Sequence, residues 1–585
     1  MESEEPLVEE NRDSKRVLAT LGAFAGELNQ VNSIALPMIV VTLSQFLLRV
    51  VALMMLGHLG ELELSSASIA TSFTNVTGFS VVFGMACALE TLCGQAHGAE
   101  QYQRVGTFTY SAIICLLLVC IPISVLWIYT DKLLILIGQD PLISVEAGKF
   151  SMWLIPSLFS YAILQSLVRY LQIQSLILPM LLSSVASLCF HLPLCWALIF
   201  KLKLGNAGAS LAICLSYVLN VTLLGLFVKY SSVCKKTHAS LSKDVFLTMG
   251  EFFRYAIPSA VMVCLEWWSF EVVILLGGLL PNPELETSVL SICLTITSLH
   301  YLVQYSFGAA ASTLVSNELG AGKPRAARVA VFAVLVLSVL EFIIASTVIF
   351  FCRYILGYAF SNEMDVVNYV KDLTPFLCLS IIVDSLQAVL SGVARGCGWQ
   401  HIGAYVNLGA YYVVGIPVAL FLGFVLHLKG EGLWSGLVAG ATVQSILLAL
   451  ITCLTNWEKQ ALDGRLIQRL NFLEQFGMAS ALETLCGQAY GAEQDQQVGT
   501  FTYGAILWLF LTQSLIQPML LSSVASLFFN LPLCWALAFK FNLENCGAAL
   551  SIGLSYWLNV ILLGLYVKYS SAYKKTRTAF SKEVF

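Results

Sequence analysis

The stretch YAIPSAVMVCLEWWSFEVVILLGG, residues 255–278, is apolar over most of its length and carries the acid Glu266 at its middle. A helix needs about 20 mainly apolar residues to cross a bilayer, so this stretch predicts a membrane span. An ionised side chain at the centre of such a span costs roughly 2.5–3.5 kcal/mol on insertion scales. We therefore expect Glu266 to serve function rather than packing.

A second stretch, LTPFLCLSIIVDSLQAVLSGV (373–393), has the same form and places Asp384 deep in an apolar segment. Apolar surroundings favour the uncharged form of a carboxyl group when no cation is near. Asp384 is therefore a candidate proton carrier. We predict Glu266 and Asp384 as the residues that couple function to protons or cations.

Apolar stretches of this kind recur along the whole chain. Of its 585 residues 58% are hydrophobic and 11% are charged, which is typical of a polytopic protein of the lipid bilayer. The apolar windows predict an all-α fold with twelve transmembrane helices, near 32–57, 64–89, 106–129, 147–170, 177–200, 207–230, 254–280, 287–314, 327–352, 368–392, 402–427 and 432–455. A net charge of −4, with the basic residues in short loops, gives a nucleic-acid partner no electrostatic support.

Several kinds of site are not expected. The seventeen cysteines are scattered through apolar segments without any CxxC pair, which argues against a disulfide framework or a zinc site. The segment GAGKPRAARVA (320–330) lacks the Gly-x4-Gly-Lys-Ser/Thr pattern of a phosphate loop, so ATP is not the expected energy source. We expect no enzyme activity, no cofactor and no metal ion.

Basic residues indicate the orientation in the membrane. They are concentrated in alternate connections, while the intervening loops are acidic or mixed. The residues taken as basic loop residues are Arg104, Arg169, Lys229, Lys235, Lys236, Lys243, Lys323, Arg325, Arg328 and Arg395. By the positive-inside rule the amino terminus should face the cytoplasm.

Interior prolines reveal an internal repeat. LPMIVVTLSQ around Pro37 aligns with IPSAVMVCLE around Pro258, and Pro156 aligns with Pro375. Two six-helix lobes in parallel repeat are expected. The alignment places Gln45 opposite Glu266 and Gln165 opposite Asp384. At these positions only the second lobe therefore carries side chains that can bind or release a proton. The predicted parts are a cytoplasmic tail (1–31), the N-lobe (32–230), a cytoplasmic linker (231–253) and the C-lobe (254–456).

Other residues are candidates for lining a substrate cavity. Gln45 and Gln165 are polar at membrane depth, and the faces of Trp267 and Trp268 suit an organic cation, although helix packing explains the tryptophans equally well. Glu271 points away from Glu266 at about 100° per residue. The helix near 287–314 is unusually polar and can supply hydrogen bonds to the acids, with Tyr301 as its candidate.

A younger repeat follows. Residues 84–113 recur as 477–506 and residues 174–246 recur as 513–585, after a predicted linker at 457–476. The copy lacks counterparts of Gln45, Gln165 and both acids. We interpret 477–585 as a partial duplicate of N-lobe segments, with two or three extra apolar segments and no transport function of its own; a regulatory domain is the alternative.

Six motifs together resemble one family: LPMIVVTLSQ, MMLGHLGELELSSASIA, LETLCGQAHGA, LEWWSFE, VSNELGAG and SGVARGCGWQ. Over about 20–458 the chain is similar to the plant-type, detoxification-carrier branch of the multidrug and toxic compound extrusion (MATE) family. The resemblance implies a V-shaped fold around a central cavity and export of organic solutes against inward proton movement. It carries the coupling glutamate of the EWW motif onto Glu266 and the helix-ten aspartate onto Asp384. Relatives with an aspartate in helix one differ from this chain, which has Gln45 and Arg49 there.

The expected function is therefore antiport of xenobiotics or secondary metabolites with protons, by a monomer in the plasma or vacuolar membrane. Sodium coupling and a lipid-linked flippase of the same fold remain the alternatives. The acids argue against the flippase, because an anionic headgroup would need a basic cavity. Which solute is carried, and in which membrane, is left open by the sequence.

Overall fold

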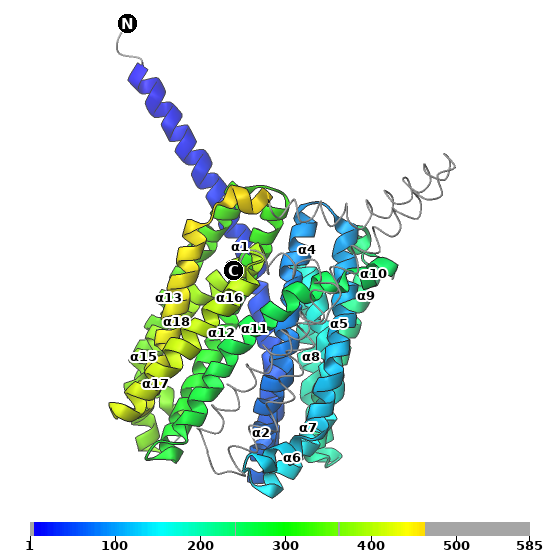
Figure 1. Ribbon diagram of the computed structural model, residues 1–585, viewed down its shortest axis with the longest axis vertical. Helices are drawn as coiled ribbons and strands as arrows, with labels where there is room; N and C mark the ends of the chain where they lie inside the picture. Colours follow the sequence, from blue (N-terminus) through cyan, green and yellow to red (C-terminus); the bar gives the residue numbers. More distant parts are fainter. Residues whose placement is uncertain (1–4, 240–241, 361–362, 463–585) are drawn as a thin grey trace, which may run out of the picture. The chain divides into compact units, whose positions relative to one another are not determined.

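A computed structural model describes residues 5–239, 242–360 and 363–462, which all lie in the first of two compact units of the chain, Met1–Gln468. This part of the chain contains helices and no strands (Figure 1). The predicted duplicate at 477–585 lies outside the described residues.

The N-lobe contains six of the spans. They are α1 (Glu5–Gly57), a broken second span, α5 (Tyr102–Ile128), α7 (Pro141–Ile173), α8 (Ile177–Trp196) with its π-helical end η2 (Ala197–Lys201), and α9 (Gly205–Tyr230). The second span consists of α2 (Glu61–Thr74), the π-helical turn η1 (Asn75–Phe79), α3 (Ser80–Ala86) and α4 (Ala88–Gly98). The helix α1 begins long before the predicted start at 32, because no proline stands between Pro6 and Pro37 to end it.

The C-lobe contains the other six. They are α11 (Met249–Gly277), α12 (Pro283–Gly320), α13 (Pro324–Phe351), α15 (Met364–Cys397), an eleventh span of mixed character, and α18 (Lys429–Leu454). The eleventh span runs through α16 (Gln400–Asn407), η5 (Leu408–Gly415), α17 (Ile416–Leu420) and η6 (Phe421–Val425), of which η5 and η6 are π-helical. Among the described residues twelve helices are long and apolar enough to cross a membrane, as predicted.

The helices of each lobe form a group of their own, coloured blue to cyan and green to yellow (Figure 1). The exception is α1, which packs on α8 and α9 of its own lobe and also on α12 and α13 of the C-lobe. The two groups meet through α3 and α4 on one side and α11, α12 and α15 on the other. These contacts hold the two lobes together as one unit.

Glycines line the closest approach of the lobes, which lies where α4 and α12 end. A Cβ atom on Gly94 would overlap the side chain of Ser316, and one on Gly98 would overlap the backbone oxygen of Asn317. Across the same seam, a Cβ on Gly320 would overlap the backbone oxygen of Gln95. The seam formed by Gly94, Gly98 and Gly320 thus requires glycine, because the helix backbones touch directly.

The substitution Gly98→Leu is expected to force α4 and α12 apart and to destabilise the protein by about 1–3 kcal/mol, as overpacking does in other tight cores. The measurement is the thermal unfolding midpoint of the purified protein in detergent. Gly225→Leu is the matched control, because no atom lies within 4 Å of a Cβ at that glycine. Equal midpoints for the two variants would contradict the tight seam.

Candidate functional site

Glu266 lies in the interior of the C-lobe, with 8% of its surface exposed. Its Oε2 accepts hydrogen bonds from three amide groups on three different helices. The donors are Gln387 Nε2 on α15 at 2.8 Å, Gln444 Nε2 on α18 at 3.4 Å and Asn407 Nδ2 on α16 at 3.5 Å. Amide nitrogens only donate, so this cradle stabilises Glu266 as a carboxylate.

Asp384 is half-buried on α15, one turn before Gln387, so the two side chains share a helix face. It interacts electrostatically with Glu266, and the buried Tyr411 interacts with both acids. Within the described part of the chain Asp384 receives no hydrogen bond. The structure therefore brings the two predicted acids into one region, one of them held by amides and the other without a fixed partner.

A small, largely enclosed pocket lies beside Glu266 and is lined by both lobes; in this conformation it has room for about one water molecule. Its walls are Phe83 of the N-lobe and Met262, Val263, Glu266, Trp267, Tyr301, Tyr305, Gln387, Ala388, Ser391 and Arg395 of the C-lobe. The rings of Phe83 and Trp267 are stacked at 5.2 Å, and Tyr301 meets Trp267 edge-on at 6.4 Å. The pocket thus combines aromatic faces with one carboxylate.

The remaining cavity candidates fall in different places. Trp267 and Tyr301 line the pocket, whereas the indole of Trp268 donates to the backbone oxygen of Val76 at 3.1 Å, across the interface between the lobes. Glu271 is half-buried and is not among the residues that line the pocket. In the N-lobe, Gln165 Nε2 donates to Gln45 Oε1 at 3.4 Å, so these two amides are hydrogen-bonded, whereas their counterparts Glu266 and Asp384 interact electrostatically.

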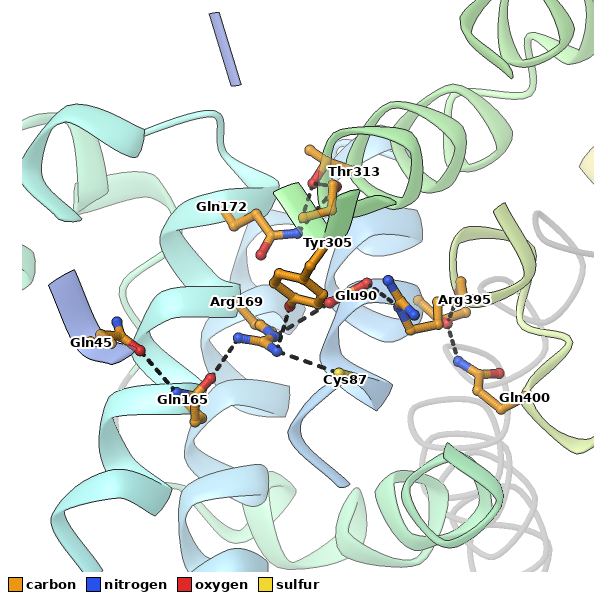
Figure 2. A network of polar contacts seen from close by, with 12 residues as sticks. Gln45, Cys87, Glu90, Gln165, Arg169, Gln172, Tyr305, Thr313, Arg395 and Gln400 are labelled. Atoms are coloured by element: carbon orange, nitrogen blue, oxygen red, sulfur yellow. Dashed lines mark hydrogen bonds and ion pairs between the residues drawn. The ribbon is translucent and has the colours of Figure 1, made fainter. Parts of the chain in front are cut away.

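A buried ionic network joins the lobes next to the pocket (Figure 2). Glu90 on α4 is fully buried between two arginines: its Oε1 lies 3.3 Å from Arg169 Nε of α7, and its Oε2 lies 2.9 Å from Arg395 Nε of α15. Arg169 also donates to Gln165 at 2.7 Å and to the Tyr305 hydroxyl at 2.8 Å. We call Glu90, Arg169 and Arg395 the ionic triad.

Further polar contacts cross between the lobes around the ionic triad. Thr91 on α4 donates to the backbone oxygen of Arg395 and accepts from Gln400 Nε2 on α16 at 2.5 Å. On the other side Gln172 Nε2 of α7 donates to Thr313 Oγ1 of α12 at 3.1 Å. Together with the glycine seam, these contacts close the lobes against one another at the end where α4, α7, α12 and α15 finish.

The structure corrects the placement of two arginines. The sequence pattern predicts Arg169 and Arg395 as loop residues, but they lie inside α7 and α15 with 1% and 6% exposure. They stand close to helix ends, where a sequence reading does not separate a loop charge from a buried one. Glu90 was missed although the signal was present, since it lies in the apolar run GMACALETLC and carries the same cost of burial as Glu266. The amides Gln387, Asn407 and Gln444 were also missed.

Comparison with known proteins identifies the family. A family model described as MatE matches residues 37–197 and 258–421, more than half of the chain. The chain belongs to the MATE family. The two matched segments of this MATE protein begin at Pro37 and Pro258, the two prolines that the internal repeat aligns.

Relatives of known name support the assignment. The chain is 57% identical to Protein DETOXIFICATION 14 of Arabidopsis thaliana over 442 residues, 76% of this chain and 91% of that protein. It is 54% identical to Protein DETOXIFICATION 12 of the same plant over 444 residues, 76% of this chain and 92% of the relative. The predicted resemblance is confirmed, and the MATE chain is a multi-pass membrane transporter rather than an enzyme.

Solved structures agree with the fold of this MATE transporter. The crystal structure of the eukaryotic MATE transporter AtDTX14 superposes with a TM-score of 0.73 at 57% identity, covering 76% of this chain and 99% of that one. The outward-facing conformation of a multidrug resistance MATE family transporter of the MOP superfamily gives a TM-score of 0.65 at 15% identity, covering 77% and 97%. The second match shows a shared fold only.

Proposed function

We propose that this MATE transporter exports small organic solutes by antiport with protons, and that Glu266 and Asp384 exchange the proton for the solute. The observation that carries the proposal is the position of the Glu266 carboxylate in a pocket lined by both lobes, with Asp384 within electrostatic reach. Protonation of the acids weakens their hold on a cationic or polarised solute, and deprotonation restores it. Proton and solute thus compete for the same carboxylates.

The surroundings of Glu266 differ from those of a typical sodium site. Sodium sites of transporters are built from oxygen atoms, often carbonyls of unwound helices. The groups that face Glu266 Oε2 are instead the amide nitrogens of Gln387, Gln444 and Asn407. Within the described ranges no cluster of three or more His, Cys, Asp or Glu residues is placed to hold a metal ion.

The pocket favours an aromatic or cationic solute over an anionic lipid headgroup. Trp267 and Tyr301 present rings beside the Glu266 carboxylate, a combination that attracts cations, whereas the Tyr305 ring already faces Arg169 and Arg395. The one guanidinium among the lining residues belongs to Arg395, which shares the carboxylate of Glu90 with Arg169. The carboxylates of Glu90 and Glu266 together balance the two arginines, so the pocket is not the basic cavity that a flippase would need.

The proposed cycle is a rocking of the N-lobe against the C-lobe. The closed end of the bundle carries the connections with Lys235, Lys236 and Lys323, so we assign it to the cytoplasm together with the amino terminus. Arg395 both lines the pocket with Glu266 and pairs with Glu90 of the other lobe. Ionised Glu266 competes with Glu90 for this arginine. The ionisation of Glu266 is thereby linked to the ion pair between Glu90 and Arg395 at the closed end.

Transport in proteoliposomes under an imposed pH gradient tests the function. We expect export of an organic cation against the proton gradient, carried out by a monomer, with no requirement for sodium. Sodium-driven transport without a pH gradient would favour the sodium antiporter, and movement of a lipid-linked substrate alone would favour the flippase. Imaging of the tagged protein separates the plasma membrane from the vacuolar membrane.

We also propose that the predicted duplicate at 477–585 has no part in transport. A chain ending at Gln468 keeps the twelve spans of the described residues, both acids and the ionic triad, so its transport rate per molecule should equal that of the full chain. The measurement is uptake into proteoliposomes at matched protein content. A folded truncated chain without transport would refute the proposal and would support a regulatory domain.

A further inference from the structure

A second pair of ionisable side chains lies within the C-lobe, apart from the pocket. His300 Nε2 on α12 lies 2.7 Å from Glu341 Oε1 on α13, and the two side chains are 8% and 17% exposed. Both residues lie near the middle of long membrane spans, and neither lines the pocket. An ionised imidazole or carboxylate at this depth carries a free-energy cost of burial, as the Glu266 carboxylate does.

Both ring nitrogens of His300 have a polar neighbour. Gln304 Nε2 lies 2.6 Å from His300 Nδ1, and Glu341 Oε1 lies on the Nε2 side. An amide nitrogen only donates, so in this orientation of Gln304 the Nδ1 lone pair accepts and the ring proton lies on Nε2, toward Glu341.

The same amide nitrogen ties α12 to α15. Gln304 Nε2 also lies 3.2 Å from Ser385 Oγ and 3.4 Å from the backbone oxygen of Ile381. The Ser385 hydroxyl itself donates to Ile381 O at 2.7 Å, so both groups facing Gln304 on α15 act as acceptors. Ser385 directly follows Asp384.

A proton added to His300 Nδ1 would break this arrangement. The ring would then present N–H to the donating nitrogen of Gln304, and two donors at that separation repel. Rotation of the amide would bring its oxygen to the ring and would end the donation of its nitrogen to Ser385 and Ile381, so that the Ser385 hydroxyl would have to donate to Gln304 instead of to Ile381. Protonation of His300 therefore reverses the direction of the bond between Gln304 and α15.

We propose that His300 is a second proton-binding site of the transporter, with Glu341 as the counter-ion of its charged form, and that Gln304 transmits its state to α15 beside Asp384. The effect on Asp384 rests on the proposed proton coupling; proton binding at His300 does not. Other ionisable residues on helices packed against α12 have no hydrogen bond or ion pair with the His300 ring in the described part of the chain. At membrane depth they are Arg49 on α1, Glu90 on α4, Arg169 on α7, Glu266 and Glu271 on α11, and Asp384 and Arg395 on α15.

Histidine NMR of the full-length protein in detergent micelles tests the site directly. We expect one histidine resonance to change with pH, to disappear in His300→Gln and to move in Glu341→Gln. His401→Gln, which removes an exposed ring on α16, is the matched control and should leave that resonance in place. The Glu341→Gln shift identifies the resonance even where His300→Gln does not fold. A His300 ring that keeps one protonation state at every pH at which the protein stays folded would overturn the proposal.

The pH profile of transport tests the link to Asp384. The pH dependence of the transport rate should lose the same step in His300→Gln and in Gln304→Leu, whereas His401→Gln should retain that step. An unchanged pH dependence in His300→Gln and Gln304→Leu would overturn the proposed transmission to Asp384. Repeating the NMR experiment in the Glu266→Gln variant separates proton binding at His300 from the proposed role of Glu266 in transport. If that variant still transports with protons, the proposed role of Glu266 fails while proton binding at His300 stands.

Discussion

Glu266→Gln should reduce proton-driven efflux to the level of empty liposomes. Glutamine keeps the shape of the side chain and still meets Gln387, Asn407 and Gln444, so the fold should persist, but the position no longer binds a proton or attracts a cation. The measurement is the initial rate of solute transport under an imposed pH gradient, at matched amounts of reconstituted protein.

Glu271→Gln is the matched control for this experiment. It neutralises an acid on the same helix, little more than one turn further along, that is not among the residues lining the pocket. We expect it to retain transport. Full transport by Glu266→Gln, or equal losses in both variants, would contradict a specific role for Glu266.

Glu90→Gln should destabilise the closed end of the bundle strongly. The change leaves Arg169 and Arg395 buried and facing each other without their shared anion, and removal of one partner from a buried ion pair costs about 3–5 kcal/mol. A marked fall in the thermal unfolding midpoint is expected, together with loss of transport. Glu61→Gln, which neutralises an exposed acid at the start of α2, serves as control.

A second substitution makes this test sharper. Arg395→Gln in the Glu90→Gln background removes one of the two unpaired charges, so the double variant should be more stable than Glu90→Gln alone. Purely additive losses would mean that Glu90 and Arg395 do not act as a pair. They would also remove the proposed link between the pocket and the closed end.

The acids and the fold were accessible from the sequence because burial in lipid leaves a strong signal. Glu266 and Asp384 interrupt long apolar runs, and the alignment of Pro37 with Pro258 places Gln45 and Gln165 at the corresponding positions of the N-lobe. Twelve spans followed from apolar length alone. In each case one dominant energy term, the cost of polar groups in hydrocarbon, decides the outcome.

The partners of Glu266 were not accessible in the same way. Gln387, Asn407 and Gln444 come from three helices, and a neutral amide in a membrane helix is common enough that its position alone does not mark a site. The ionic triad could not be predicted from the sequence for another reason. An arginine near a helix end fits the positive-inside rule and a buried ion pair equally well, and only the contact with Glu90 distinguishes them.

The glycine seam has a consequence for how fast the closed end can part. Where side chains interlock, separation requires many rotamers to rearrange, but Gly94, Gly98 and Gly320 contribute no side chains of their own, so few side chains have to move apart there. The peptide groups exposed on separation are already hydrogen-bonded within their own helices, so water that enters the gap meets few unpaired backbone groups. Resistance to opening is thereby concentrated in a small number of ion pairs and hydrogen bonds, and the strength of such contacts changes when one proton is added.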